Sequence, residues 1–320
     1  MTKESRARWA LLAVPALLAP GTGLAQAWPD RPVRVLVGVL AGGGVDLVAR
    51  TVAEGLGSRL GQQFVVDNRP GATSAIMYDL LAKATPDGYT LGATSDAMMV
   101  HPFMRKFDPY AVFAPIALMA KQPLIVTLHA GLPPKTIADL VSLAKAKPNS
   151  LSFGTASASQ HLTGELVWKR LGIPVTHIPY KGGSQVIVDV AGGQIPLGVL
   201  GASIVLPQAR AGRVRMLAVT SAERSAMLPQ VPGMVESGAP GVDVFQWLCL
   251  MGPAALPKAL IARIEAETVA VVGLPLTQER LATAGMEPAP LRSAGLLALW
   301  RRDTARWAGL VKETGIQLAQ

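Results

Sequence analysis

Three consecutive glycines at 42–44 are the residues of this sequence best placed to do chemistry, because they connect an apolar run at 33–40 to a helical pattern at 46–60. Glycines allow the backbone to approach a ligand closely, and the following helix presents unpaired N–H groups and the positive end of its dipole. Together these features favour an anion such as a phosphate or a carboxylate. Asp46 is expected to cap the helix, and a purely structural turn is the alternative interpretation.

A second stretch of small polar residues, 155–160, follows an apolar run and precedes a helix expected to start near His161. Hydroxyl side chains at a helix N-terminus either cap the helix or contribute to an anion site. Residues 94–97 also follow a strand pattern and could add a third wall to a cleft between the first two loops. Ser157 and His161 could alternatively form a hydrolytic pair, although no orienting acid is identifiable for them.

Other kinds of chemistry have little support in the sequence. The four histidines lack the close spacing of a metal site, no Gly-x-Ser-x-Gly motif occurs, and the single Cys249 lies in an apolar segment typical of an inert thiol. The formal net charge is +9, but the basic residues are scattered and aromatic residues make up only 5% of the chain. We therefore expect no metal, no cofactor and no nucleic-acid partner, and at most an attraction for small anions.

The first 27 residues carry the pattern of a secretory signal peptide. Three basic residues and one acidic residue precede a short apolar run at 10–19, and Ala25-Gln-Ala27 forms a cleavage site. The apolar run is shorter than the roughly 20 residues that span a bilayer. We therefore expect export to the periplasm and cleavage before Trp28. The chain that remains after cleavage would have a formal net charge of +7 instead of +9.

Short β-branched or apolar runs alternate with helical patterns along the rest of the chain. Such alternation is typical of βαβ units and of a mostly parallel sheet. The 320 residues are enough for two domains of ordinary size. The sequence therefore predicts an α/β protein with two lobes, of which the first is completed by the C-terminal segment.

Several short motifs follow one another along the chain after residue 27. They are Gly42-Gly-Gly-Val-Asp46, Asp67-Asn-Arg-Pro-Gly-Ala72, Pro86-Asp-Gly-Tyr-Thr-Leu91, Ala144-Lys-Ala-Lys-Pro148, His161-Leu-Thr-Gly-Glu-Leu166, His177-Ile-Pro-Tyr-Lys-Gly182, Gly192-Gly-Gln194, Leu217-Ala-Val-Thr-Ser221 and Leu228-Pro-Gln-Val-Pro232. In kind and in order these motifs resemble those of the Bug, or TctC-like, family of periplasmic solute-binding receptors, which serve tripartite tricarboxylate transporters. The resemblance covers nearly all of the chain after residue 27.

The resemblance implies a type II periplasmic-binding-protein fold, in which each lobe is a mixed sheet flanked by helices and the ligand lies between the lobes. Lobe 1 is expected at 28–123 plus 248–320, and lobe 2 at 124–247. The implied function is capture of a small carboxylate without catalysis. The residues expected to contact this ligand are Leu40, Ala41, Gly42, Gly43, Gly44, Asp46, Thr94, Ser95, Asp96, Ser157, Ala158, Ser159, Tyr180 and Leu200.

The sequence departs from the family pattern at several positions. Thr73 and Ser74 stand where two glycines usually follow Arg-Pro-Gly-Ala, Leu200 stands where many members have Asp, and Cys249 stands where glycine is usual. In the family that Asp helps to discriminate ligands with amino or amide groups, so Leu200 disfavours them. We therefore expect a less polar or larger carboxylate, either aromatic or aliphatic.

The resemblance also implies a partner in the membrane. The receptor is expected to be a monomer that delivers its ligand to the large and small membrane subunits of a tripartite transporter. One alternative is a receptor that signals to a membrane sensor without transport. The other, from a different class, is an exported hydrolase that uses Ser157 and His161.

Overall fold

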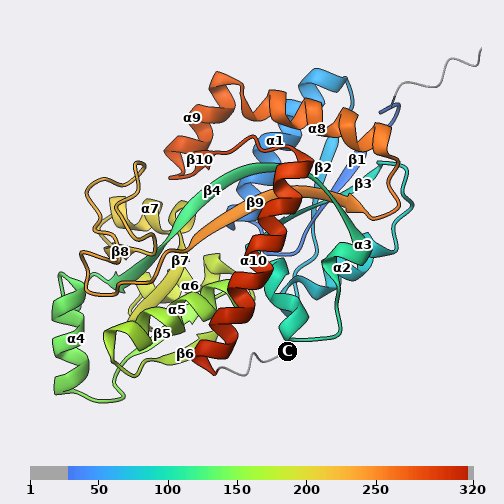
Figure 1. The fold of residues 1–320 in the computed structure, drawn as a ribbon. Coiled ribbons are helices and arrows are strands. Elements are labelled where there is room, and N and C mark those ends of the chain that lie inside the picture. The colour runs from blue at the N-terminus through green and yellow to red at the C-terminus, as the bar shows by residue number, and fades with distance from the viewer. Residues whose placement is uncertain (1–27, 316–320) are drawn as a thin grey trace, which may run out of the picture.

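The longest strand, β4 (Phe113–His129), runs through both halves of the molecule and forms part of each sheet (Figure 1). The structure, a computed structural model, describes residues 28–315, so the expected signal peptide lies outside the described residues. Within that range the strands follow the order β2-β1-β3-β9-β4-β7-β5-β6, with β8 and β10 also paired to β4.

The first half of β4 belongs to a mixed sheet. Its parallel part is made of β1 (Val33–Val37), β2 (Phe64–Asn68) and β3 (Thr90–Ser95). The strand β9 (Phe245–Pro253) lies antiparallel between β3 and β4, and the short β10 (Glu287–Pro288) pairs with β4.

From Leu124 onward β4 pairs instead with β7 (Leu197–Gly201) and β8 (Val214–Val219), both antiparallel. Two further strands, β5 (Ser152–Thr155) and β6 (Thr176–Pro179), continue this second sheet in parallel with β7. The two sheets with their helices form the predicted two-lobed α/β fold, which is confirmed. The exact division at 123/124 and 247/248 stays a prediction, supported by the change of pairing partners along β4.

Helices cover both faces of the first sheet. On one face lie α1 (Gly44–Leu60), α8 (Lys258–Val272) and α9 (Pro275–Thr283), whose buried apolar side chains pack with those of the strands in one cluster. On the other face lie α2 (Ala75–Ala82), the 3₁₀ helix η2 (Asp96–Phe103), α3 (Pro109–Val112) and α10 (Ser293–Thr314). A short turn, η1 (Ala72–Ser74), precedes α2.

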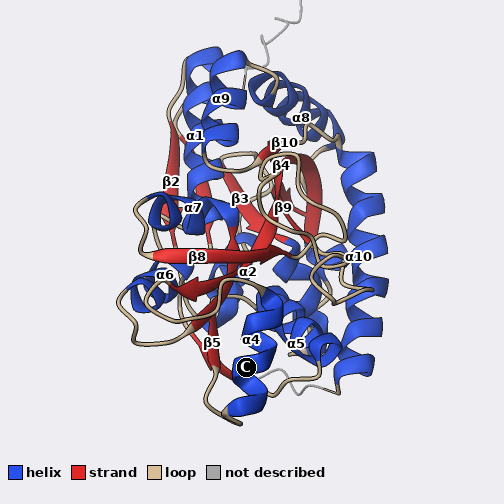
Figure 2. Cartoon of the chain, turned by 90° about the vertical axis from the view of Figure 1, so that its left-hand side faces the viewer, coloured by secondary structure: helices blue, strands red, loops and turns tan. Residues whose placement is uncertain are grey.

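The second sheet carries α4 (Ile137–Ala146), α5 (Ala158–Leu171), α6 (Gly183–Ala191) and α7 (Ala202–Arg210). The long helix α10 runs beside both lobes, from the region of β4 and β9 to that of α5 (Figure 2). Among the described residues, none of the helices is both long and apolar enough to span a bilayer.

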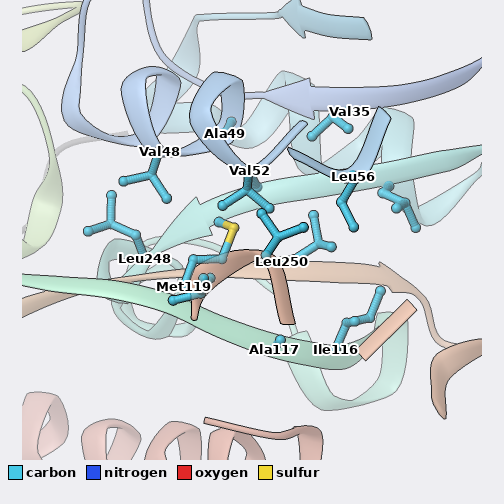
Figure 3. Close-up of a cluster of buried hydrophobic side chains, with 14 of the residues drawn as sticks. Val35, Val48, Ala49, Val52, Leu56, Ile116, Ala117, Met119, Leu248 and Leu250 are labelled. Carbon is cyan, nitrogen blue, oxygen red and sulfur yellow. The ribbon is translucent and has the colours of Figure 1, made fainter. Parts of the chain in front are cut away.

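The core of the first lobe follows from alternation along its strands. In β9, Leu248 and Leu250 pack against α1, whereas Cys249 and Met251 point to the opposite face. Figure 3 shows side chains of α1 meeting Met119 and the β9 leucines between the helix and the sheet. Each strand residue therefore packs on one of two layers, as the period of two in a strand requires.

Two helix starts differ from the sequence-based expectation. Helix α1 begins at Gly44 with Gly43 as its N-cap, so the prediction that Asp46 caps the helix is wrong. Helix α5 begins at Ala158, three residues before the expected start, because the Ser157 hydroxyl accepts a hydrogen bond from the Gln160 N–H and caps it.

Candidate ligand-binding site

A cavity of about 530 Å³ lies between the two lobes. Its size falls within the roughly 300–1,000 Å³ of typical small-molecule sites. One wall comes from loops of the first lobe and the other from the second lobe. The lining residues are Gly38, Val39, Gly71, Ala72, Thr73, Ser74 and Met104 on the first side, and Thr155, Ala156, Ser157, Ala158, His161, His177, Pro179, Tyr180 and Lys181 on the second.

The first wall combines the loop after β1 with the turn before α2. The Ser74 hydroxyl donates to the Gly38 carbonyl at 3.0 Å and so ties the two segments together. Gly38 is required at this contact, because a Cβ there would lie 2.5 Å from the Ser74 Cβ. The carboxyl ends of β1 and β2 thus bring both segments to the same edge of the sheet.

The second wall is built around the N-terminus of α5. Gln160 folds back so that its side-chain oxygen accepts from the Ala156 N–H at 3.0 Å, while Ser157 accepts from the Gln160 N–H at 3.3 Å. The positive end of the helix dipole therefore lies at the cavity wall. This partial positive charge attracts a negatively charged ligand group even though no Lys or Arg side chain is involved.

Two histidines lie stacked in the same wall. The rings of His161 and His177 are parallel within 10°, with centroids 3.6 Å apart. His177 Nε2 lies 2.8 Å from the Thr155 hydroxyl, and His161 Nε2 lies 3.4 Å from a Glu165 carboxylate oxygen. Burial, together with the neighbouring His161, lowers the pKa of His177 to about 3, so that ring is neutral near pH 7.

Tyr180 and Lys181 complete this side. The Tyr180 hydroxyl donates to Asp189 at 2.7 Å, and burial together with this carboxylate raises the pKa of Tyr180 to about 12. Its aromatic ring, rather than its hydroxyl, is thus available as cavity surface. Among the described lining residues, Lys181 is the one Lys or Arg, and it is exposed.

The geometry does not assemble the hydrolytic pair considered from the sequence. The Ser157 hydroxyl is occupied in capping α5 and lies 3.3 Å from the Ser159 hydroxyl. The His161 ring faces His177 and Glu165 instead. A nucleophile needs its base within hydrogen-bond reach, and no such bond joins Ser157 to His161 in residues 28–315.

Three of the residues predicted to contact the ligand line the cavity, namely Ser157, Ala158 and Tyr180. The glycine loop lies beside it, because Gly38 and Val39 just before the loop form the wall. Leu40 approaches the second lobe: a Cβ on Gly182 would lie 2.9 Å from a Leu40 methyl carbon.

The remainder of that loop is not among the described residues that line the cavity. Ala41 and Gly42 are exposed, whereas Gly43 and Gly44 are buried. Asp46 is buried and accepts from the Gly42 N–H at 3.0 Å, from Asn68 and from Arg50. Burial alone would raise the pKa of Asp46, but these hydrogen bonds outweigh it and hold the pKa below its usual value. A ligand role for this loop stays a prediction.

The expected third wall, 94–97, lies in the interior rather than among the lining residues. Thr94 shares a 2.8 Å hydrogen bond with Tyr78, and Ser95 accepts from the Ala97 N–H. Asp96 is fully buried, like Ser159 of α5, which faces it. Contact of these residues with a ligand also stays a prediction.

Leu200 is fully buried in β7, where it pairs with Ile125 and joins an apolar cluster of the second lobe. It is not among the described residues that line the cavity. Its effect on ligand choice therefore stays a prediction.

Sequence reasoning missed most of the first wall and part of the second. The turn at 71–74, Met104 and the two histidines were not proposed as ligand contacts, although all line the cavity. One signal could have found the turn: it follows β2, which is parallel to β1, and ligands bind beyond the carboxyl ends of such strands.

Comparison with known proteins gives consistent findings. The chain matches the family model described as the tripartite tricarboxylate transporter family receptor over residues 48–316. It is 32% identical to protein BugT of Bordetella pertussis, over 96% of this chain and 98% of that one. Among solved structures it is similar to Rpa4515 of R. palustris with adipate, with 30% identity, a TM-score of 0.87 and coverage of 90% of this chain and 99% of that one. It is also similar to the periplasmic binding protein BugD, with 32% identity, a TM-score of 0.86 and coverage of 91% and 99%.

Proposed function

The chain belongs to the tripartite tricarboxylate transporter receptor family, and we propose that it captures a small organic carboxylate in the cavity between its two lobes. The observation that carries this proposal is the cavity itself, whose walls come from different lobes. A ligand that touches both walls stabilises the closed arrangement, since it binds that arrangement better than an open one.

The wall chemistry supports a carboxylate with an apolar body. The N-terminus of α5 favours the anionic end, and Val39, Met104, Ala156 and Pro179 offer apolar surface to the remainder. Adipate, which is bound in the similar Rpa4515, is a molecule of this kind. The expectation of a less polar or larger carboxylate therefore becomes our proposal for the ligand class.

We further propose that the chain is exported through residues 1–27 and hands its ligand to membrane subunits of a tripartite transporter. The family membership and the similarity to a periplasmic binding protein support this role. Binding without turnover is part of the proposal, because Ser157 serves as a helix cap and has no base beside it among the described residues.

The first test identifies the ligand. Protein purified without added carboxylate is denatured, and the released small molecules are analysed by mass spectrometry. In parallel, thermal unfolding is followed with adipate, benzoate, citrate or aspartate. We expect adipate or benzoate to raise the unfolding temperature most, because their apolar bodies match the apolar surface of the cavity. A ligand at 100 times its Kd stabilises the native state by about 2.7 kcal/mol.

The outcomes separate the parts of the proposal. Stabilisation by citrate or aspartate alone would overturn the ligand class but keep the receptor function. No stabilisation by any of these acids, with no small molecule released, would contradict carboxylate capture. Hydrolysis of generic esters that disappears in Ser157→Ala would contradict binding without turnover.

A further inference from the structure

The turn before α2 has an unusual backbone. Ala72, Thr73 and Ser74 have φ values of 44°, 55° and 76°, so three successive residues other than glycine are left-handed. Each such residue costs roughly 1–2 kcal/mol, because its Cβ crowds the following carbonyl oxygen. A strained segment of this kind persists only where its surroundings hold it. All three residues line the cavity.

One contact holds the middle of the turn. Nε2 of His101, a buried residue near the C-terminal end of η2, lies 2.6 Å from the Thr73 carbonyl oxygen. A carbonyl oxygen only accepts, so Nε2 carries the proton and donates. The His101 ring is 1% exposed and stands edge-on to Tyr78, with centroids 4.9 Å apart. Packing against Tyr78 of α2 and against Phe107 therefore also holds the ring in place.

A second contact holds the end of the turn. The Ser74 hydroxyl donates to the Gly38 carbonyl, and the Ser74 N–H donates to the Gly71 carbonyl at 3.0 Å. The turn is thus attached to the β1 loop on one side and to η2 on the other. His101 is the one of these partners that does not line the cavity.

We propose that His101 is a positioning residue of the binding site: it holds the left-handed turn at 72–74 as a preformed wall of the cavity before the ligand arrives. The proposal rests on the proposed function, since the wall matters only if the cavity binds a ligand. It adds a residue outside the cavity that controls affinity.

The physical consequence is a population effect. Without the hydrogen bond, Thr73 relaxes towards right-handed conformations in part of the molecules, and the wall is absent in these. Apparent affinity falls in proportion to the fraction of molecules that keep the wall. Glycine at position 73 removes the dependence, because glycine adopts the left-handed conformation at little cost.

The experiment measures adipate affinity by calorimetry for the wild type, His101→Phe, Thr73→Gly and the double variant. We expect His101→Phe to weaken binding about tenfold, the factor that matches the strain of one left-handed residue. Thr73→Gly should restore most of this loss in the double variant. His101→Gln keeps an N–H donor and should bind more tightly than His101→Phe.

His129→Phe is the matched control, because its Nδ1 also contacts a backbone carbonyl, that of Val190, but it does not line the cavity. It should leave adipate affinity unchanged. The proposal would be overturned if His101→Phe bound adipate as tightly as the wild type does. It would also be overturned if the double variant bound adipate as weakly as His101→Phe does.

A readout without ligand separates this proposal from the proposed function. His101→Phe should lower the unfolding temperature less in the Thr73→Gly background than in the wild type. If His101→Phe lowers the unfolding temperature equally in both backgrounds, His101 does not hold the turn, even if adipate binds. If no carboxylate binds the wild type, the proposed function fails, and these unfolding temperatures still decide whether His101 holds the turn.

Discussion

Asp96 is a residue whose ionisation depends strongly on the fold. Its carboxyl is fully buried, with the Ser159 side chain and the Ala97 backbone N–H beside it. Burial, together with the charge of Asp303, raises its pKa from 3.8 to about 7, while Arg306 opposes the shift. The native state therefore holds this proton at pH values where the unfolded chain has released it.

This difference makes stability depend on pH. Below about pH 4 both states keep the Asp96 proton, and between pH 4 and 7 only the native state does, so the stability that Asp96 contributes is lost as pH rises through that window. Asp96→Asn removes the effect. We expect the variant to exceed the wild type in stability by on the order of 2–4 kcal/mol at pH 8 and to match it near pH 4.

Urea unfolding of both proteins at pH 4, 6 and 8 measures this difference. The pH 4 values serve as the control for any change in packing. A stability difference that stays constant from pH 4 to pH 8 would show that the fold does not raise the pKa of Asp96.

Single residues also show where sequence reasoning stops. Ser157 could be assigned to the site from its place before a helix, and Tyr180 from the family motif that contains it. Thr73 lines the cavity in a left-handed backbone conformation. That conformation is unfavourable for threonine and depends on His101, which is 28 residues away. No local pattern contains this information.

At the scale of elements, the antiparallel strands β4 and β9 join the lobes. Gln122 of β4 donates to the side-chain oxygen of Gln246 in β9 at 2.7 Å and accepts from the Ser203 N–H at 3.0 Å. Both glutamines are buried. One side chain thus connects both crossing strands with the start of α7, at the position where β4 changes sheets.

Gln122→Leu should be strongly destabilising, because it leaves the Gln246 oxygen and the Ser203 N–H buried without partners. An unsatisfied buried polar group costs roughly 1–3 kcal/mol. The free energy of unfolding from urea titrations tests this. Gln278→Leu, an exposed site on α9, is the control and should change it by less than about 0.5 kcal/mol. Equal effects of both variants would contradict a structural role for Gln122.

The elements themselves were predictable where periodicity is strong. Strand β1 and helix α1 lie within a few residues of the apolar run at 33–40 and the helical pattern at 46–60, because a strand pattern and a helical pattern follow each other there. Strand β9 and the first half of β4 were not identified as strands. Both are buried on two faces, so they lack the alternation of apolar and polar residues that marks a half-buried strand.

At the scale of the whole molecule, α10 connects the lobes a second time. Trp300 and Trp307 are buried, and Glu313 near its C-terminal end forms a 2.7 Å ion pair with Arg170 of α5. The two-lobed fold was predictable from the βαβ alternation and from the family motifs. The position of the ligand site between the lobes was predictable from the same motifs. Most of the residues that line the cavity were not, because the lining depends on how close the loops of the two lobes approach.

The central claim is that the cavity between the lobes is the ligand site, and one calorimetric titration tests it directly. Adipate is titrated into the wild type, into Ala156→Trp, which places a large ring in the cavity wall, and into Ala254→Trp, an exposed site outside the described cavity lining. We predict one bound adipate for the wild type and for Ala254→Trp, and at least 100-fold weaker binding for Ala156→Trp. Equal affinity in all three proteins would contradict the account.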